Sequence, residues 1–233
     1  MDPTGEQFPP PANIVSADVV VFGVRPDEDD RKSLQVLLVR RPWEPFAGYW
    51  ALPGDYVRPQ ESLNAAAARA LTDKTGLRPA YLEQLYTFGL PERGARDRVV
   101  SVAYYALARH DVAWSAADRP DSIRWWPVDR LPVVLAFDHA RIVDYALWRL
   151  RNKVSYAHVA FQFLPPTFTL AQLREVYEVI WMRRLDPTNF RRRVAAAGTI
   201  VPTAERVAGG RHRPPQLFRC AVDPNELYQG PPA

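Results

Sequence analysis

The residues most able to do chemistry lie in one stretch, residues 50–77 (W-A-L-P-G-D-Y-V-R-P-Q-E-S-L-N-A-A-A-A-R-A-L-T-D-K-T-G-L). Divalent metals that activate water for hydrolysis need a cluster of oxygen ligands, and the carboxylates of Glu61 and Asp73 are suitable ones. Ala70 offers no ligand, however, and Lys74 brings a positive charge into the same cluster. The stretch therefore looks like the catalytic loop and helix of an enzyme whose catalytic residues are altered.

The local sequence predicts the elements that hold these residues. Pro53 and Gly54 break the preceding apolar run and predict a turn. Ser62 is a suitable helix N-cap, and Gly76 lies where a helix commonly ends in a left-handed glycine. The apolar positions with helical spacing are Leu63, Ala66, Ala67, Ala70 and Leu71. We therefore expect a loop, a short alanine-rich helix and a glycine stop.

The spacing resembles the Nudix box, G-x5-E-x7-R-E-U-x-E-E-x-G-U, in which U is apolar. The matching positions are Glu61, Arg69, Leu71, Gly76 and Leu77. The departing positions, where the family has a glycine and three metal-binding glutamates, are Asp55, Ala70, Asp73 and Lys74. The resemblance therefore implies a metal-dependent hydrolase that is inactive or nearly so. The preceding run R-R-P-W-E-P-F-A-G-Y-W-A-L-P-G-D resembles the approach to the box in ADP-ribose-type Nudix domains. By itself, the box leaves open an ordinary core helix after a Pro-Gly turn.

The sequence around the box is rich in β-branched runs that predict strands. These runs are Ile14–Val24, Leu34–Val39, Ala80–Phe88, Val99–Ala108 and Ser122–Pro127. The next five residues, V-D-R-L-P, suggest a turn-and-helix element of the kind usual in Nudix domains. Strands on both sides of one short helix predict a mixed sheet between helices. The resemblance thus implies an α/β fold for residues 1–132, an N-terminal Nudix α/β/α sandwich with a degenerate Nudix box.

A Nudix domain without its metal cluster can still bind a nucleoside diphosphate. Arginine and lysine side chains near the box suit pyrophosphate, and aromatic side chains suit adenine or ribose. The residues predicted to bind the ligand are Arg40, Arg41, Phe46, Trp50, Arg58, Glu61, Arg69, Lys74 and Arg98. For Phe46 and Trp50, core packing is the competing interpretation. Glu61 and Arg69 also suit a structural ion pair between loop and helix.

The charge distribution separates the two halves of the chain. The 233 residues carry a net charge of +4, yet residues 141–233 hold 14 Lys and Arg against 7 Asp and Glu. All but one of those basic residues are arginine, whose planar fork suits phosphate oxygens and guanine edges. A solvated basic surface is the plainer interpretation. The asymmetry suggests two domains with different partners.

The second half of the chain predicts a connecting helix and a helix-turn-helix. Residues 133–154 contain an amphipathic helix over residues 138–153. In residues 155–233, a helix over residues 170–181 precedes an arginine-rich helix over residues 187–197. Strands at 199–202 and 217–219 flank a basic Gly/Pro tip, residues 203–216. We therefore predict an α+β domain, a C-terminal winged helix-turn-helix.

A helix of this kind fits the major groove of double-stranded DNA, and a basic wing can hold phosphates. The residues predicted to bind DNA are Thr169, Thr188, Asn189, Arg191, Arg192, Arg193, Arg206, Arg211, His212 and Arg213. Since helix neighbours are about 100° apart, the three consecutive arginines cannot all face one way. A basic module that binds protein is the alternative.

The two predicted domains together resemble the Nudix-related transcriptional regulators of NAD metabolism, the NrtR family. The resemblance rests on the runs L-A-F-D-H-A-R-I-V, F-T-L-A-Q-L-R-E-V-Y-E and L-D-P-T-N-F-R-R-R-V. It implies a homodimeric repressor of NAD biosynthesis or salvage genes that senses ADP-ribose or a related NAD-derived nucleotide and is not an enzyme. The family often has R-D-P-R-G where this chain has R-G-A-R-D-R, a difference that bears on the effector. A sugar-responsive regulator and a residual ADP-ribose pyrophosphatase are the alternatives.

Other classes of protein are disfavoured. A single cysteine, Cys220, argues for a reducing compartment. No apolar run approaches the ~18 residues of a membrane span, and the N-terminus does not resemble a signal peptide. The chain is therefore expected to be cytoplasmic, without a membrane partner. No metal site and no required cofactor are predicted, because His139 and His158 lack partners at ligand spacing.

Overall fold

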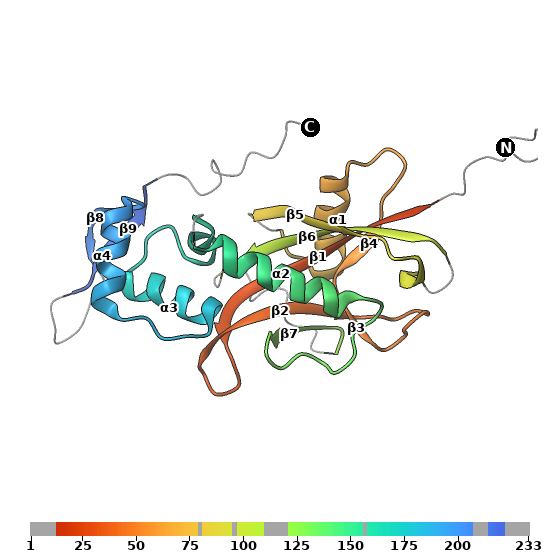
Figure 1. Cartoon of the computed structure of the whole chain (residues 1–233), viewed down its shortest axis with the longest axis horizontal. Helices are drawn as coiled ribbons and strands as arrows, with labels where there is room; N and C mark the ends of the chain where they lie inside the picture. The colour runs from red at the N-terminus through yellow and green to blue at the C-terminus, as the bar shows by residue number, and fades with distance from the viewer. Residues whose placement is uncertain are drawn as a thin grey trace, which may run out of the picture.

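The computed structural model describes residues 13–78, 81–94, 97–109, 121–155, 158–206 and 214–221. Figure 1 shows a broad mixed sheet at one end and a small group of helices with a hairpin at the other. One long helix, α2, runs along the sheet toward the smaller group. Within the described residues, no helix is long and apolar enough to cross a membrane.

The large sheet is built on β1 (Ile14–Pro26), the predicted β-branched strand, which is buried along most of its length. The other strands are β2 (Lys32–Arg40), β3 (Trp50–Ala51), β4 (Gly54–Tyr56), β5 (Tyr81–Phe88), β6 (Val99–Ala108) and β7 (Ile123–Pro127). The main order is β3-β2-β1-β6-β5, with β4 also paired to β1 and β7 to β2. The pair β1–β6 is parallel, and the other pairs are antiparallel. All five predicted strands are therefore present.

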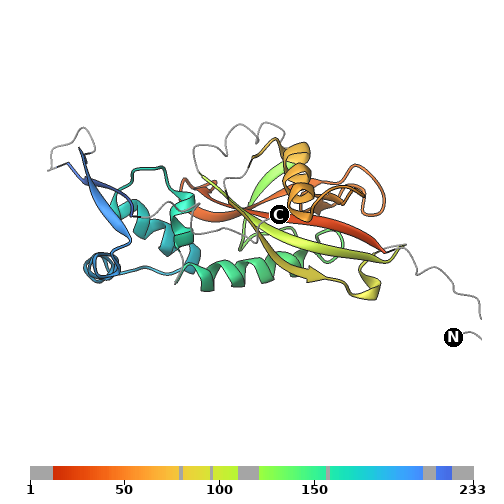
Figure 2. The same cartoon turned by 90° about the horizontal axis from the view of Figure 1, so that it is seen from above.

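Two helices cover opposite faces of this sheet, as Figure 2 shows from above. Helix α1 (Leu63–Thr75) has the predicted caps: the Ser62 hydroxyl accepts from the Ala65 amide, and Gly76 adopts φ 75°. Its alanines pack against one face of β1. Helix α2 (His139–Lys153) packs its buried stripe against the other face. The α/β/α sandwich is confirmed.

Some segments differ from the sequence expectation. Strands β3 and β4 lie in the stretch predicted as loop, because its backbone pairs with β2 and β1. The turn-and-helix prediction for residues 128–132 is wrong in part, since a turn is present but the next helix begins at His139. Pro132 lacks the N–H group that a helix through these residues would use. The 3-10 helices η1 (Pro91–Arg93) and η2 (His158–Phe163) were not foreseen.

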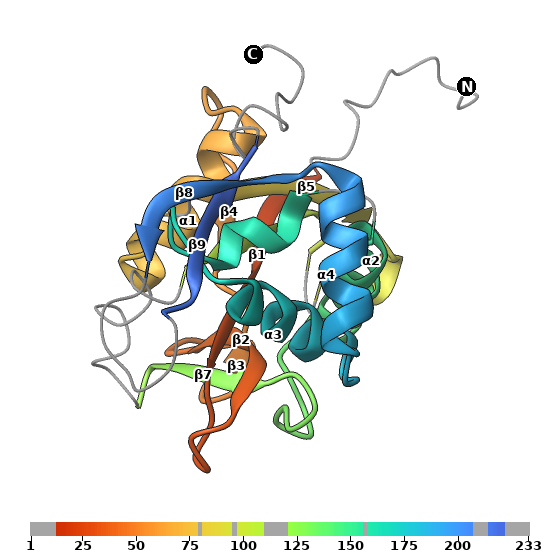
Figure 3. The same ribbon diagram turned by 90° about the vertical axis from the view of Figure 1, so that its left-hand side faces the viewer.

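The smaller group has the helix-turn-helix and hairpin of a winged helix (Figure 3). Helix α3 (Leu170–Trp181) begins with a capping box between Thr169 and Gln172. Helix α4 (Pro187–Ala197) is capped by Asp186, whose carboxylate accepts from the Asn189 amide. Strands β8 (Ile200–Arg206) and β9 (Gln216–Cys220) form the hairpin. Strand β8 extends beyond the predicted 199–202, and residues 207–213 of the predicted tip lie outside the described part of the chain.

Polar contacts help to hold the winged helix on the rest of the molecule. The Arg151 guanidinium donates to the Ile180 carbonyl at 3.0 Å, and the Trp181 indole donates to the Arg151 carbonyl at 3.1 Å. Lys32 of β2 pairs with Glu175 of α3 at 2.5 Å. The C-terminal end of α2 and the start of β2 are therefore both tied to α3.

Candidate ligand pocket and DNA interface

A cavity of about 360 Å³ opens beside the degenerate Nudix box. Its wall is formed by β1, the loop after β2, β4, the last turn of α1, η1 and the start of α2. The lining residues with polar or aromatic side chains are Ser16, Asp18, Arg41, Trp43, Glu44, Asp55, Tyr56, Lys74, Arg93, Asp97, Phe137 and His139. Segments far apart in the sequence therefore meet at this cavity, and one of them is the N-terminal end of α2.

The floor of the cavity is a buried ion network centred on Arg93. The Arg93 guanidinium lies 2.9 Å from a carboxylate oxygen of Asp138 and 3.3 Å from one of Asp18. The Arg93 and Asp18 side chains are only 5% and 9% exposed. Ser16 and Ser101 also donate hydrogen bonds to Asp18. Since buried charges must be paired, this network fixes η1 against β1 and the N-cap of α2.

His139 completes the floor as a neutral imidazole. Its Nδ1 accepts the Leu52 amide proton at 2.9 Å, so that nitrogen carries no proton. Its Nε2 lies 3.9 Å from Asp18. Burial lowers the pKa of His139, although the nearby Asp18 carboxylate opposes this shift. The first residue of α2 is thus tied to Leu52, which directly follows β3 on the way into the box.

This arrangement predicts a pH dependence of stability. Because the folded pKa of His139 lies below the unfolded value of about 6.5, the unfolded chain binds the proton more readily. The free energy of unfolding should therefore fall as pH decreases from about 6.5 toward the lowered pKa. Urea unfolding between about pH 8 and about pH 5 should show this loss. In His139→Gln, the free energy of unfolding should change less steeply with pH. Identical slopes for the two proteins would contradict the assignment.

Cationic and aromatic groups surround the mouth of the cavity. Lys74 projects from the last turn of α1 and is exposed. The Arg41 guanidinium lies 4.7 Å from the ring centre of Phe137 and donates to the Pro45 carbonyl. Trp43 is 76% exposed. The mouth therefore offers positive charge for phosphate and flat surfaces for a ring.

The remaining box carboxylates are held by Arg69 beside this mouth. Arg69 donates to Glu61 at 2.7 and 3.0 Å, to Asp55 at 2.6 Å and to the Tyr56 carbonyl at 2.9 Å. Hydrogen bonding to Arg69 lowers the pKa of Glu61 to about 2. Ala70 is fully buried. Glu61 and Arg69 thus form the ion pair between loop and helix that the sequence suggested as a structural alternative.

The structure brings two of the nine predicted ligand residues, Arg41 and Lys74, to the cavity wall. Three of the others have contacts of their own: Arg40 donates to the Gly48 carbonyl, Phe46 packs on Phe137 and Trp50 on Trp126. Arg58 and Arg98 are exposed. Asp18, Arg93 and Asp138 were not among the residues predicted from the sequence. A lone carboxylate inside the apolar run of β1 was the available signal for Asp18.

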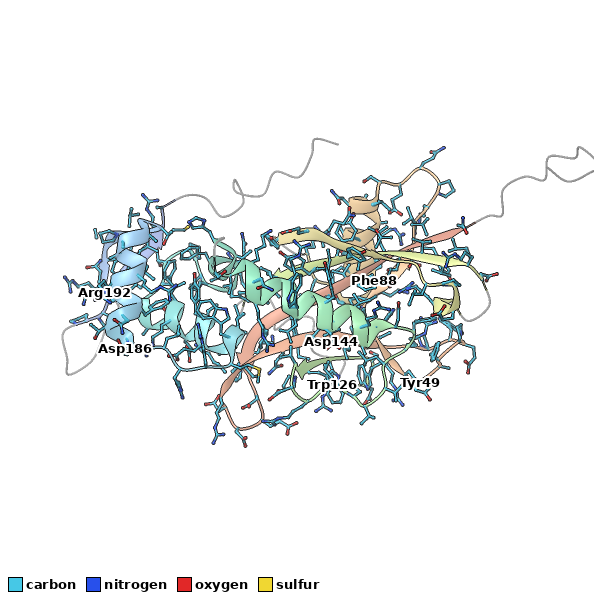
Figure 4. All side chains as sticks on the ribbon, viewed as in Figure 1. Tyr49, Phe88, Trp126, Asp144, Asp186 and Arg192 are labelled. Carbon is cyan, nitrogen blue, oxygen red and sulfur yellow. The ribbon has the colours of Figure 1, made fainter. Side chains whose placement is uncertain are left out.

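The predicted DNA-binding residues of α4 form its exposed side. Thr188, Asn189, Arg191, Arg192 and Arg193 are all exposed, and Arg192 donates to the Asn189 carboxamide oxygen at 2.9 Å. Figure 4 places Asp186 and Arg192 at the end of the molecule far from Tyr49. The arginines differ in surroundings, because Arg193 also lines a cavity beneath α4. A helix surface of this composition can enter the major groove.

The other predicted DNA contacts are less uniform. The Thr169 hydroxyl caps α3 by accepting from the Gln172 amide. Arg206 extends from β8 and donates to the Pro214 carbonyl at 3.3 Å. Arg211, His212 and Arg213 lie outside the described residues. Helix α4 is therefore the best defined part of the predicted DNA interface.

Known proteins match both parts of the chain. The model of the NUDIX domain matches residues 16–146, and that of the NrtR DNA-binding winged helix domain matches residues 160–220. The ADPR responsive transcriptional repressor NtrR of Acinetobacter baylyi is 34% identical over 215 residues, which are 91% of this chain and 84% of that protein. An ADP-ribose pyrophosphatase of Methanocaldococcus jannaschii is 33% identical over 119 residues, 51% of this chain and 69% of that protein.

Solved structures show the same arrangement of domains. Shewanella oneidensis NrtR in complex with a 27mer DNA has a TM-score of 0.78 and 33% identity, covering 91% of this chain and 96% of that one. A MutT/nudix family protein of Enterococcus faecalis has a TM-score of 0.73 over 93% of this chain and 90% of that one, with 24% identity. The second likeness concerns the fold alone.

Proposed function

Since this chain belongs to the NrtR family, we propose that it is a transcriptional repressor of NAD biosynthesis or salvage genes, with DNA binding controlled by ADP-ribose or a related nucleotide. The observation that carries the proposal is that helix α2 reaches the ligand cavity at its first residue and the winged helix at its last turn. At the start of α2, His139 lines the ligand cavity and the N-cap Asp138 pairs with Arg93 of the cavity wall, while the last turn of α2 contacts α3 through Arg151. A ligand at one end can therefore bias the position of the DNA-binding helices at the other.

For the effector, we assign Lys74 and Arg41 to the pyrophosphate. Both are cations on the cavity wall, and charge-assisted hydrogen bonds to phosphate are strong. The exposed ring of Trp43 and the ring of Phe137 offer surfaces for the adenine. The printed name of the Acinetobacter baylyi relative, which responds to ADP-ribose, supports this class of ligand.

We further propose that the effector leaves the pocket intact. Metal-assisted cleavage needs several carboxylates that are free to bind cations. Here Glu61 and Asp55 are engaged by Arg69, Ala70 supplies no oxygen and Lys74 adds a positive charge. The likeness to a Methanocaldococcus jannaschii pyrophosphatase keeps residual hydrolysis as the second candidate. Turnover of ADP-ribose with Mg²⁺ that disappears in Glu61→Gln would favour that candidate.

On DNA, we propose that a homodimer places two α4 helices in successive major grooves. Operators for such proteins have half-sites about one helical turn apart, so a small change in helix spacing weakens binding. By linkage, ADP-ribose must weaken operator binding by the factor with which the operator weakens ADP-ribose binding.

Titration of the operator complex with ADP-ribose tests both the assignment of the effector site and the release of DNA. The wild-type protein should release DNA, and Lys74→Glu should shift the midpoint at least about tenfold upward, because a carboxylate then faces the phosphates. Arg58→Glu is the matched control, since Arg58 is exposed and does not line the cavity. Fluorescence anisotropy of labelled operator gives the midpoints. Wild-type complex that stays intact at every ADP-ribose concentration would refute the switch.

A further inference from the structure

A second cavity, of about 170 Å³, lies inside the winged-helix end of the molecule. It is bounded by the end of α2, by η2, by α3 and by the inner side of α4. No residue of this cavity lines the pocket proposed for ADP-ribose. It therefore needs its own explanation.

The walls of this cavity are aromatic. The Tyr177 and Trp181 rings lie 5.1 Å apart on α3, and Phe190 of α4 meets Tyr177 edge-on at 5.5 Å. On the other side, His158 stacks on Phe161 at 5.8 Å. Flat rings pack well against such walls. An apolar cavity of about 150 Å³ is large enough for benzene, whereas drug-sized ligands occupy about 300–1,000 Å³. The space thus suits a single ring.

Three polar side chains with no hydrogen-bond partner among the described residues face the same cavity. Within the described part of the chain, the side chains of His158, Tyr177 and Arg193 make no hydrogen bond or ion pair. Arg191 and Arg192 do not line the cavity, so Arg193 is the cation at its edge. Burial raises the pKa of the Tyr177 hydroxyl, which keeps it a hydrogen-bond donor. A cation and a hydroxyl donor beside an aromatic slot match a ring that carries a carboxylate.

We propose that this cavity is a second ligand site, which takes a small aromatic monocarboxylate. The ring lies between Tyr177, Trp181 and Phe161, and the carboxylate accepts from Arg193 and Tyr177. Because α4 forms one wall, occupancy alters the support of the helix that carries the predicted DNA contacts. The site is separate from the ADP-ribose switch, and its test does not depend on that switch.

Three probes separate the ring from the charge. Benzoate has both, benzamide has the ring without the charge, and acetate has the charge without the ring. Calorimetric titration of the full-length protein, free of DNA, should give benzoate an affinity at least about tenfold higher than either of the others. Equal affinities for benzoate and benzamide, or no benzoate binding, would overturn the proposal.

Variants then locate the site. Arg193→Gln should raise the benzoate Kd at least about tenfold, since a charged hydrogen bond is lost, while Arg192→Gln should leave it unchanged. Ala197→Leu fills the cavity from the outer end of α4 and should also abolish binding, which covers the case in which Arg193→Gln misfolds. Equal effects of the two arginine variants would place benzoate elsewhere and refute the assignment.

Discussion

Arg93→Leu should lower the free energy of unfolding by about 3–5 kcal/mol, because it removes one partner of a buried ion network. The guanidinium is 5% exposed and lies between the carboxylates of Asp18 and Asp138. Its loss leaves the Asp18 carboxylate, itself 9% exposed, without its cation. Urea unfolding at neutral pH measures the effect. A loss below about 1 kcal/mol would show that the network contributes little.

Two further variants test whether the loss of stability comes from the buried charge network. Arg58→Leu changes an exposed arginine of the same domain. Its free energy of unfolding should stay within about 0.5 kcal/mol of the wild-type value. Adding Asp18→Asn to Arg93→Leu should recover part of the stability, since the uncompensated charge is then absent. Failure of this double variant to recover any stability would mean that Arg93 acts through packing rather than through charge.

The same network shows what the sequence could predict and what it could not. The boundaries of α1, α3 and α4 follow from local signals, since Ser62, Thr169 and Asp186 cap their own helices. The partners of Arg93 come from β1 and the N-cap of α2, 75 and 45 positions away in the chain. No periodicity encodes such a contact, so the floor of the pocket had to come from the structure.

The aromatic residues near the box illustrate a second limit. Trp50 was a predicted ligand residue, with core packing as the competing interpretation. In the fold it packs against Trp126 of β7, with ring centres 5.6 Å apart. Successive residues of a strand point to opposite faces of the sheet. Only the pairing of β3 with β2 decides which face Trp50 takes. Of the nine predicted ligand residues, only Arg41 and Lys74 therefore line the cavity beside the box.

Arg192→Ala should weaken operator binding more than any other single change on α4. Arg192 lies on the exposed side and is oriented by the Asn189 carboxamide at 2.9 Å, as Figure 4 places it on the outer end of the molecule. A bidentate arginine–guanine contact contributes about 1–3 kcal/mol, and the proposed homodimer would lose two of them. The expected loss is therefore about 2–6 kcal/mol, or about 30-fold to 10⁴-fold in Kd.

Arg192→Lys decides whether this arginine reads bases or holds phosphate. Lysine keeps the charge but not the planar fork, so a base contact is lost and a phosphate contact survives. Operator anisotropy at several salt concentrations should show weak binding by Arg192→Lys with an unchanged salt slope, because the number of neutralised phosphates is the same. The Arg193 side chain borders the cavity under α4, so Arg193→Ala should weaken operator binding less than Arg192→Ala does. Wild-type affinity in Arg192→Lys would assign Arg192 to the phosphate backbone and leave base reading to Asn189 and Arg191.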